Sequence, residues 1–256
     1  MMNNMFSKIN RWHFLIPLTL LAISMIWIFY PQPQQSTILV DIQQREVLRV
    51  GLDASFPPFE TLDADGQIVG FDVDIAQSIA DDLEVELECV NISFDGLYDA
   101  LKIGRVDLLI SGLPVDPYLT EDVAYSVNYF NAGQVLITTA PNIQGIDDLA
   151  GKQVNVVWGS TGDIVARQLQ KTYPDLVIMS QPDIETIFGA SNLGLAIVDA
   201  VSAYGKKEVH VITYLTNDWY AVAVKLKDDD LLHAVNDTLN RLIKSGELQR
   251  LQIEWF

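Results

Sequence analysis

The chain has 256 residues, which is enough for one large domain or for two lobes of about 100 residues each. Its hydrophobic content is 49% and its net charge at pH 7 is −18. A chain this acidic repels nucleic acid and anionic lipid headgroups, so we exclude both as ligands. The single cysteine, Cys89, cannot form an internal disulfide, and its place in an alternating apolar run predicts a buried thiol.

The N-terminal segment has the pattern of a membrane anchor. Residues 12–30 are mostly apolar and follow two basic residues, Lys8 and Arg11. Because about 20 apolar residues cross a bilayer, we expect an uncleaved signal-anchor here, with residues 1–11 in the cytoplasm. A cleaved signal peptide is the alternative. Residues 31–45 are polar, contain prolines and lack periodicity, which predicts a spacer before an extracytoplasmic body.

The most informative stretch is residues 48–80. Its pattern predicts a strand, a loop that contains Pro57 and Pro58, a hairpin with a Gly turn, and an amphipathic helix, in this order. Open α/β sheets bind ligands in loops at the carboxyl ends of their strands. Asp53 and Phe56 lie in such a loop and are therefore candidate ligand-binding residues.

This stretch resembles the signature of the family 3 extracellular solute-binding proteins, the receptors of polar amino-acid ABC transporters. The residues that carry the resemblance are Asp53, Phe56, Pro58, Phe59, Glu60, Gly70, Phe71, Asp72, Val73 and Asp74. Further matches follow along the chain, at Ala100, Leu101, Gly104, Arg105, Asp107, Gly112, Asp148 to Val154 and the final Trp255 and Phe256. The resemblance thus covers about Val47 to Phe256.

The resemblance implies an α/β fold of the two-lobed periplasmic-binding-protein type II, in which each lobe is a mostly parallel sheet flanked by helices. We expect lobe 1 to comprise residues 46–133 and 219–256, and lobe 2 residues 134–218. The segments 134–138 and 220–224 would be the two strands that cross between the lobes. Such proteins bind by hinge closure of the two lobes around the ligand.

The resemblance also implies a binding site for an α-amino acid. Asp199 matches the acidic residue that takes the ammonium group. Ser160 and Thr161 match a turn at a helix start that offers amides and a hydroxyl to the carboxylate, as helix N-termini can. The expected lobe 1 contacts, besides Asp53, are the aromatic rings of Phe56 and Phe94 and the strand end at Ser111 and Gly112.

The chain departs from the family pattern at one part of this site. Pro114 and Leu119 stand where the family has a Thr and an Arg, and the Arg normally clamps the ligand carboxylate with two parallel hydrogen bonds. An aliphatic side chain can neither donate a hydrogen bond nor carry charge. The ligand class therefore stays open between an amino acid and a cationic or neutral polar solute.

We expect a solute-binding protein of an ABC importer that captures an amino acid or a related amine and acts as a monomer with a transporter permease. We expect no catalytic residue, no metal and no cofactor. A sensor or accessory ligand-binding module is one alternative. A cyclohexadienyl-dehydratase-like enzyme is another, since such enzymes resemble these proteins. The loss of the carboxylate clamp at Leu119 argues against the enzyme.

Overall fold

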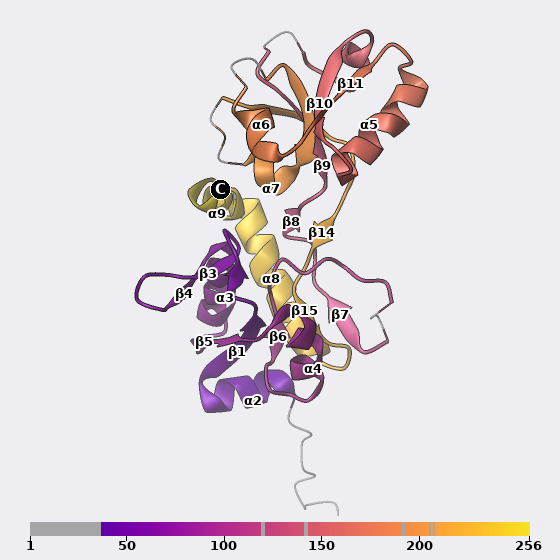
Figure 1. Cartoon of the computed structure of the whole chain (residues 1–256). Helices are drawn as coiled ribbons and strands as arrows, with labels where there is room; N and C mark the ends of the chain where they lie inside the picture. Colours follow the sequence, from indigo (N-terminus) through magenta and orange to yellow (C-terminus); the bar gives the residue numbers. More distant parts are fainter. Residues whose placement is uncertain (1–36, 119–120, 141–142, 191–192, 205, 207) are drawn as a thin grey trace, which may run out of the picture. The chain divides into compact units, whose positions relative to one another are not determined.

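The computed structural model describes residues 37–118, 121–140, 143–190, 193–204, 206 and 208–256 (Figure 1). The predicted cytoplasmic end, signal-anchor and first part of the spacer, residues 1–36, lie outside the described residues. Among the helices that the structure does describe, none is long and apolar enough to cross a bilayer.

Two five-stranded sheets organise the described part of the chain. Sheet 1 contains, from edge to edge, β5 (Glu86–Asn91), β1 (Val47–Leu52), β6 (Leu108–Leu109), β15 (Ala223–Lys225) and β7 (Val123–Tyr125). Sheet 2 contains β11 (Val177–Gln181), β10 (Gln153–Val157), β12 (Leu195–Asp199), β9 (Gln134–Thr138) and β13 (His210–Tyr214). Two small sheets complete the set, β2 (Ser55–Phe56), β3 (Glu60–Leu62) and β4 (Ile68–Val69) in one, β14 (Trp219–Tyr220) and β8 (Phe130–Asn131) in the other.

Helices separate several of these strands along the chain. They are α2 (Ile38–Arg45), α3 (Phe71–Asp82), α4 (Leu97–Lys102), α5 (Thr161–Thr172), α6 (Ile184–Phe188), α7 (Ala200–Ala203), α8 (Asp229–Ser245) and α9 (Glu247–Trp255). Short 3-10 turns lie at Phe94–Gly96 and Ile146–Leu149. Both sheets share one strand pattern: three parallel strands, then a fourth that is antiparallel to its neighbours. The predicted α/β architecture with two mostly parallel sheets is confirmed.

Side chains that alternate along the strands bury both faces of each sheet. In β6 and the residue after it, Leu108 and Ile110 join the core that α3 and α8 cover, whereas Leu109 joins the core beside α4. In β12, Ile197 packs with α5 and Val198 packs with α6 and α7. Successive side chains of a strand point to opposite faces, so a continuous apolar run fits a strand covered by helices on both sides.

Two segments cross between the sheets, as predicted, but most residues of the two predicted strands lie within the sheets themselves. Residues 134–138 form β9, a strand of sheet 2 that is paired on both sides, and 223–225 form β15 of sheet 1. The chain instead passes from one sheet to the other through the short pair β8 and β14. A long apolar run is stabilised more as a central strand than as a connection, because a central strand buries apolar side chains on both faces of the sheet. The side chain of Asn131 secures the pair, since its Oδ1 accepts from the amides of Gly133 and Asp218.

Part of the predicted spacer is a helix. Residues 38–45 form α2, which is capped by the hydroxyl of Thr37 and buries Ile42 completely. Arg45 at its end forms an ion pair with Asp107, a carboxylate that Arg49 also binds at 2.9 Å. These contacts attach α2 to sheet 1, so this part of the predicted spacer belongs to the folded body.

The thiol of Cys89 is half-buried, whereas the alternating pattern predicted a buried one. The reason is its position in β5, an edge strand that pairs with β1 on one side. Desolvation still raises the pKa of this thiol to about 11, which keeps it protonated and unreactive at neutral pH.

Candidate functional site

Three loops of sheet 1 meet at the carboxyl ends of the adjacent parallel strands β5, β1 and β6. The carboxylate of Asp53, after β1, accepts from the backbone N–H of Phe94, after β5, at 2.7 Å. The N–H of Asp53 donates to Oγ of Ser111, after β6, at 3.0 Å. Three of the predicted site residues are thus joined directly, although they are about 40 to 60 positions apart in the chain. The second oxygen of Asp53 accepts from the Ser55 hydroxyl, so this carboxylate holds the loops together.

The predicted aromatic residues remain partly open to solvent. The side chains of Phe56 and Phe94 are 39% and 46% exposed, which is unusual for large apolar groups in an ordered loop. The ring of Phe56 stacks on Phe59 with centroids 5.0 Å apart. It also lies over Gly112, where an added Cβ would come within 2.6 Å of the ring. The Phe56 ring is therefore held in place with part of its surface free, and the contact of either ring with a ligand stays a prediction.

The polar groups of Ser111 and Gly112 face the protein. The Ser111 side chain is buried, accepts from Asp53 and donates to the carboxyl group of Glu60. The N–H of Gly112 donates to Asp72 at 2.7 Å, and its φ of +52° suits glycine. These two groups already have partners, so they hold the shape of the strand end.

In sheet 2 the corresponding edge carries the start of α5. The chain leaves β10, turns at Gly159 with φ +73°, and Ser160 caps the helix by accepting from the N–H of Asp163. Thr161 is exposed in the first turn. Gly162 lies so close to β12 that a Cβ would meet the Ile197 carbonyl oxygen at 2.7 Å. The first-turn amides and the helix dipole make this end of α5 suited to an anion.

Asp199 ends β12 and caps α7. Its two carboxylate oxygens accept from the N–H and the hydroxyl of Ser202, each at 2.8 Å, and the residue is half-buried. Because β10 and β12 are adjacent and parallel, the start of α5 and Asp199 lie at the same edge of sheet 2. A carboxylate and a helix N-terminus on one edge can bind an ammonium group and a carboxylate of the same small molecule.

Two features of this region escaped the sequence analysis. Trp158 directly precedes the Gly159 turn and is 74% exposed. A tryptophan after a buried strand is normally expected in the core, so only its exposure in the structure makes Trp158 a candidate site residue. The other feature is a buried carboxyl pair, Glu60 and Asp72, both 0% exposed. Both residues belong to the family signature, but sequence alone does not show that two acids are buried together.

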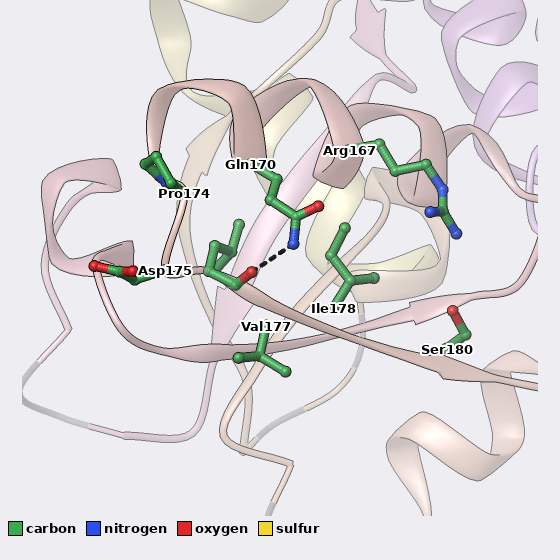
Figure 2. A pocket seen from close by; sticks show the side chains of 8 residues that line it. Arg167, Gln170, Pro174, Asp175, Val177, Ile178 and Ser180 are labelled. Carbon is green, nitrogen blue, oxygen red and sulfur yellow. Dashed lines mark hydrogen bonds between the residues drawn. The ribbon is translucent and has the colours of Figure 1, made fainter.

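The position that departs from the family pattern, Leu119, lies outside the described residues. Pro114 forms a single bridge with Tyr220 in β14. A separate surface pocket of about 590 Å³ lies between α5 and β11. The side chains that line it, seen in Figure 2, belong to Arg167, Gln170, Pro174, Asp175, Leu176, Val177, Ile178 and Ser180. None of the predicted site residues lines it, and its one base, Arg167, forms an ion pair with Asp163 at 3.0 Å.

Two helix-flanked sheets with loops at their strand ends define a two-lobed α/β binding protein. A family model described as bacterial extracellular solute-binding proteins, family 3, matches residues 48–256. The chain belongs to this family, and the predicted resemblance is confirmed. It is 29% identical over 226 residues to the L-arginine-binding protein of Pseudomonas aeruginosa, and the match covers 82% of this chain and 87% of that protein.

Solved structures agree with the type II periplasmic-binding-protein fold. An ancestral cationic amino acid solute-binding protein matches with a TM-score of 0.65 and 30% identity, covering 86% of this chain and 100% of that one. An ancestral amino-acid-binding protein described as a precursor of cyclohexadienyl dehydratase matches with a TM-score of 0.56 and 31% identity, with the same coverage. The predicted function class, a solute-binding protein, follows from the family.

Proposed function

We propose that this protein captures a cationic amino acid outside the cytoplasm and delivers it to the permease of an ABC importer. The observation that carries the proposal is the shared edge of sheet 2, where the Asp199 carboxylate lies beside the N-terminus of α5. An α-amino acid carries an ammonium and a carboxylate group at fixed separation, and this edge offers one partner for each. The relatives named above bind arginine or cationic amino acids, which supports the same class.

The side chain of the ligand would meet the aromatic groups. The side chains of Phe56 and Phe94 are partly exposed, and Trp158, next to the α5 turn, is largely exposed. Aromatic faces attract cations by about 0.5 to 2 kcal/mol, and the acidic chain adds a favourable long-range field. A guanidinium or ammonium side chain therefore fits the site better than an acidic one. It also fits a site where Leu119 replaces the usual Arg, because that replacement removes a positive charge.

Binding would act through the hinge. A ligand that contacts both lobes favours the state in which they are closed, by the difference in its affinity for the two states. Capture then needs no chemical step. The named relatives are binding proteins, which agrees with a role outside catalysis. We propose further that the protein is a monomer, held at the membrane by residues 12–30, and that the lobes divide at residues 133/134 and 218/219.

The test is a thermal-shift titration of the full chain in mild detergent with L-arginine, agmatine, L-glutamine and L-glutamate. Ligand at 100 times Kd should add about 2.7 kcal/mol of stability. We expect the largest shift with L-arginine. Agmatine lacks the carboxylate, so a smaller shift with it supports the role of the α5 N-terminus.

Asp199→Asn is the matched variant for the ammonium group. Asparagine caps helices as well as aspartate does, so α7 stays intact while the charge is lost. We expect the apparent affinity for L-arginine, derived from the thermal shifts, to fall at least tenfold in this variant. An equal shift with agmatine and L-arginine would contradict the amino acid assignment, and no shift with any of the four would favour the sensor or accessory module.

The dehydratase alternative has one observation in its favour, the match to a precursor of that enzyme. That precursor is itself described as an amino-acid-binding protein. Incubating the protein with a cyclohexadienyl substrate and measuring aromatic product by absorbance decides between the two. Turnover above the buffer rate would overturn the assignment as a binding protein.

A further inference from the structure

Two carboxyl groups are buried against each other behind the loops of sheet 1. Glu60, at the start of β3, and Asp72, in the first turn of α3, are each 0% exposed. Their hydrogen-bond partners, Ser111 and Gly112, are neighbours in the chain. The Asp72 charge helps to raise the pKa of Glu60, and a hydrogen bond from Glu60 lowers the pKa of Asp72. Two ionised carboxylates in contact within a dry interior would repel each other and lose their hydration, so at least one must hold a proton.

The remaining hydrogen bonds indicate which group holds it. Oδ2 of Asp72 accepts from the N–H of Gly112 at 2.7 Å and from the hydroxyl of Tyr129 at 2.9 Å. Two donors on one oxygen stabilise an anion. Glu60 accepts one hydrogen bond, from Ser111 to its Oε1. Among the described residues, Glu60 Oε2 and Asp72 Oδ1 are buried atoms that receive no donor. One proton between them would satisfy both.

We propose that Glu60 donates a proton from Oε2 to Oδ1 of Asp72 at neutral pH, and that this pair is a positioning device for the ligand-facing loops. The anion of Asp72 holds Gly112, and the acid of Glu60 holds Ser111. Ser111 in turn accepts from Asp53, the residue that joins the loop of Phe94. The pair touches no ligand, and its effect on affinity rests on the function proposed above.

The electrostatic surroundings of the pair agree with this assignment. Burial is the largest cause that raises the pKa of Glu60, to about 10, with the Asp72 charge next. Burial also raises the pKa of Asp72, to about 7, against the lowering effect of Gly112 and Tyr129. The other groups that act on Glu60 are Ser111 and the Asp53 carboxylate, and Tyr220 lies near both acids.

The first experiment compares wild type with Glu60→Gln in the full chain. Glutamine keeps the shape, accepts from Ser111 with its oxygen and donates to Asp72 with its amide, so it imitates the protonated acid. Asp81→Asn is the control, an exposed acid on the same helix α3. Stability is measured by urea unfolding from pH 5 to pH 9.

The sign of the expected change follows from proton linkage. The native state holds the Glu60 proton above the ordinary pKa of 4.5, where the unfolded chain releases it. This contribution to wild-type stability is fully present below pH 4.5 and is lost as the pH rises toward 10. We expect the unfolding constant of wild type relative to Glu60→Gln to rise by up to tenfold per pH unit across pH 5 to 9. Asp81→Asn should follow wild type.

Infrared spectroscopy tests the shared proton without unfolding or ligand. The carbonyl stretch of a protonated carboxylic acid should be present in wild type at pH 8 and absent from Glu60→Gln. Its absence from wild type, together with parallel pH curves for the two proteins, would overturn the proposal of a shared proton.

Amide hydrogen exchange tests the positioning role, also without ligand. In Asp72→Ala we expect the N–H of Gly112 to exchange at least tenfold faster, while amides of β10 in sheet 2 are unchanged. Tyr129→Phe, which keeps the Asp72 acceptor, is the second variant and should leave Gly112 protected. Equal protection of Gly112 in all three proteins would contradict a positioning role. Because none of these readouts needs a ligand, failure of the arginine titration would leave them interpretable and would refute only the proposed function.

Discussion

The ring of Phe256, the last residue of the chain, packs against the ring of Tyr204 with centroids 5.2 Å apart. Phe256 follows α9, which packs on the core of sheet 1, whereas Tyr204 follows α7, which packs on sheet 2. Phe256 also contacts Phe59 at 5.1 Å and Phe130 of β8 at 5.2 Å. The C-terminal aromatic group thus joins residues of both lobes beside the strand pair through which the chain crosses.

Replacing Phe256 with alanine should lower the free energy of unfolding by about 2 kcal/mol. The substitution removes a half-buried ring and several aromatic contacts. Its cost in stability should therefore be smaller than the 3 to 5 kcal/mol that is typical for a fully buried Phe. Ile253→Ala, in the adjoining helix α9, is the control, since Ile253 is 74% exposed. Urea unfolding measures both, and equal stability of the two variants would show that the aromatic cluster contributes nothing.

Gly112→Ala should weaken ligand binding and lower stability by about 1 to 3 kcal/mol. The new methyl group would meet the Phe56 ring at 2.6 Å, and alanine disfavours the φ of +52°. Gly145→Ala is the control, because nothing lies within 4 Å of its Cβ position and its φ is −160°. Calorimetric titration with L-arginine measures the change in affinity, and thermal unfolding measures the change in stability. Wild-type affinity in Gly112→Ala would mean that the Phe56 ring does not contact the ligand.

Tyr129→Phe should destabilise the protein more at alkaline than at acidic pH. The Tyr129 hydroxyl donates to Asp72, whose pKa is raised to about 7 by burial, so the acceptor becomes an anion above that pH. A hydrogen bond to a charged group contributes about 1.5 to 3 kcal/mol, against about 1 for a neutral one. We expect about 2 kcal/mol of destabilisation at pH 8 and about half as much at pH 5.5.

Tyr98→Phe provides the comparison for this pH dependence. Its hydroxyl is 3.0 Å from the hydroxyl of Tyr125, so the lost bond joins two neutral groups between pH 5.5 and 8. Its effect on stability should not change over that range. If the two variants respond to pH in the same way, Asp72 does not titrate near pH 7.

Trp158→Ala should leave stability within about 0.5 kcal/mol of wild type, because the side chain is 74% exposed. If its ring faces the cationic side chain of the ligand, the affinity for L-arginine should fall about 2- to 5-fold, as expected for an exposed cation–π contact. Trp158→Phe keeps a ring and should recover part of the affinity. Competition against a fluorescent ligand measures all three proteins, and a stronger effect on L-glutamine than on L-arginine would exclude a cation–π role.

Much of the fold was predictable because its signals are local. The strand and the amphipathic helix expected within residues 48–80 are β1 and α3, and both follow from apolar periodicity, which depends on neighbouring residues alone. The turn at Gly66 and the helix start at Ser160 have the same local origin. The crossing strands and α2 were misjudged because their outcome depends on which distant surface covers them.

The sequence by itself determined the family, the two sheets and the loops at the strand ends, because the change from an apolar strand to a polar loop can be read from neighbouring residues. These loops carry Asp53, Phe56, Phe94, Ser160 and Asp199. Only the tertiary structure decided that Ser111 faces inward and that Trp158 is open to solvent. It also decided that Glu60 and Asp72 are both buried and bind the adjacent residues Ser111 and Gly112. Burial and the energy of a charge depend on groups brought together from remote positions, and no local pattern of residues encodes that proximity.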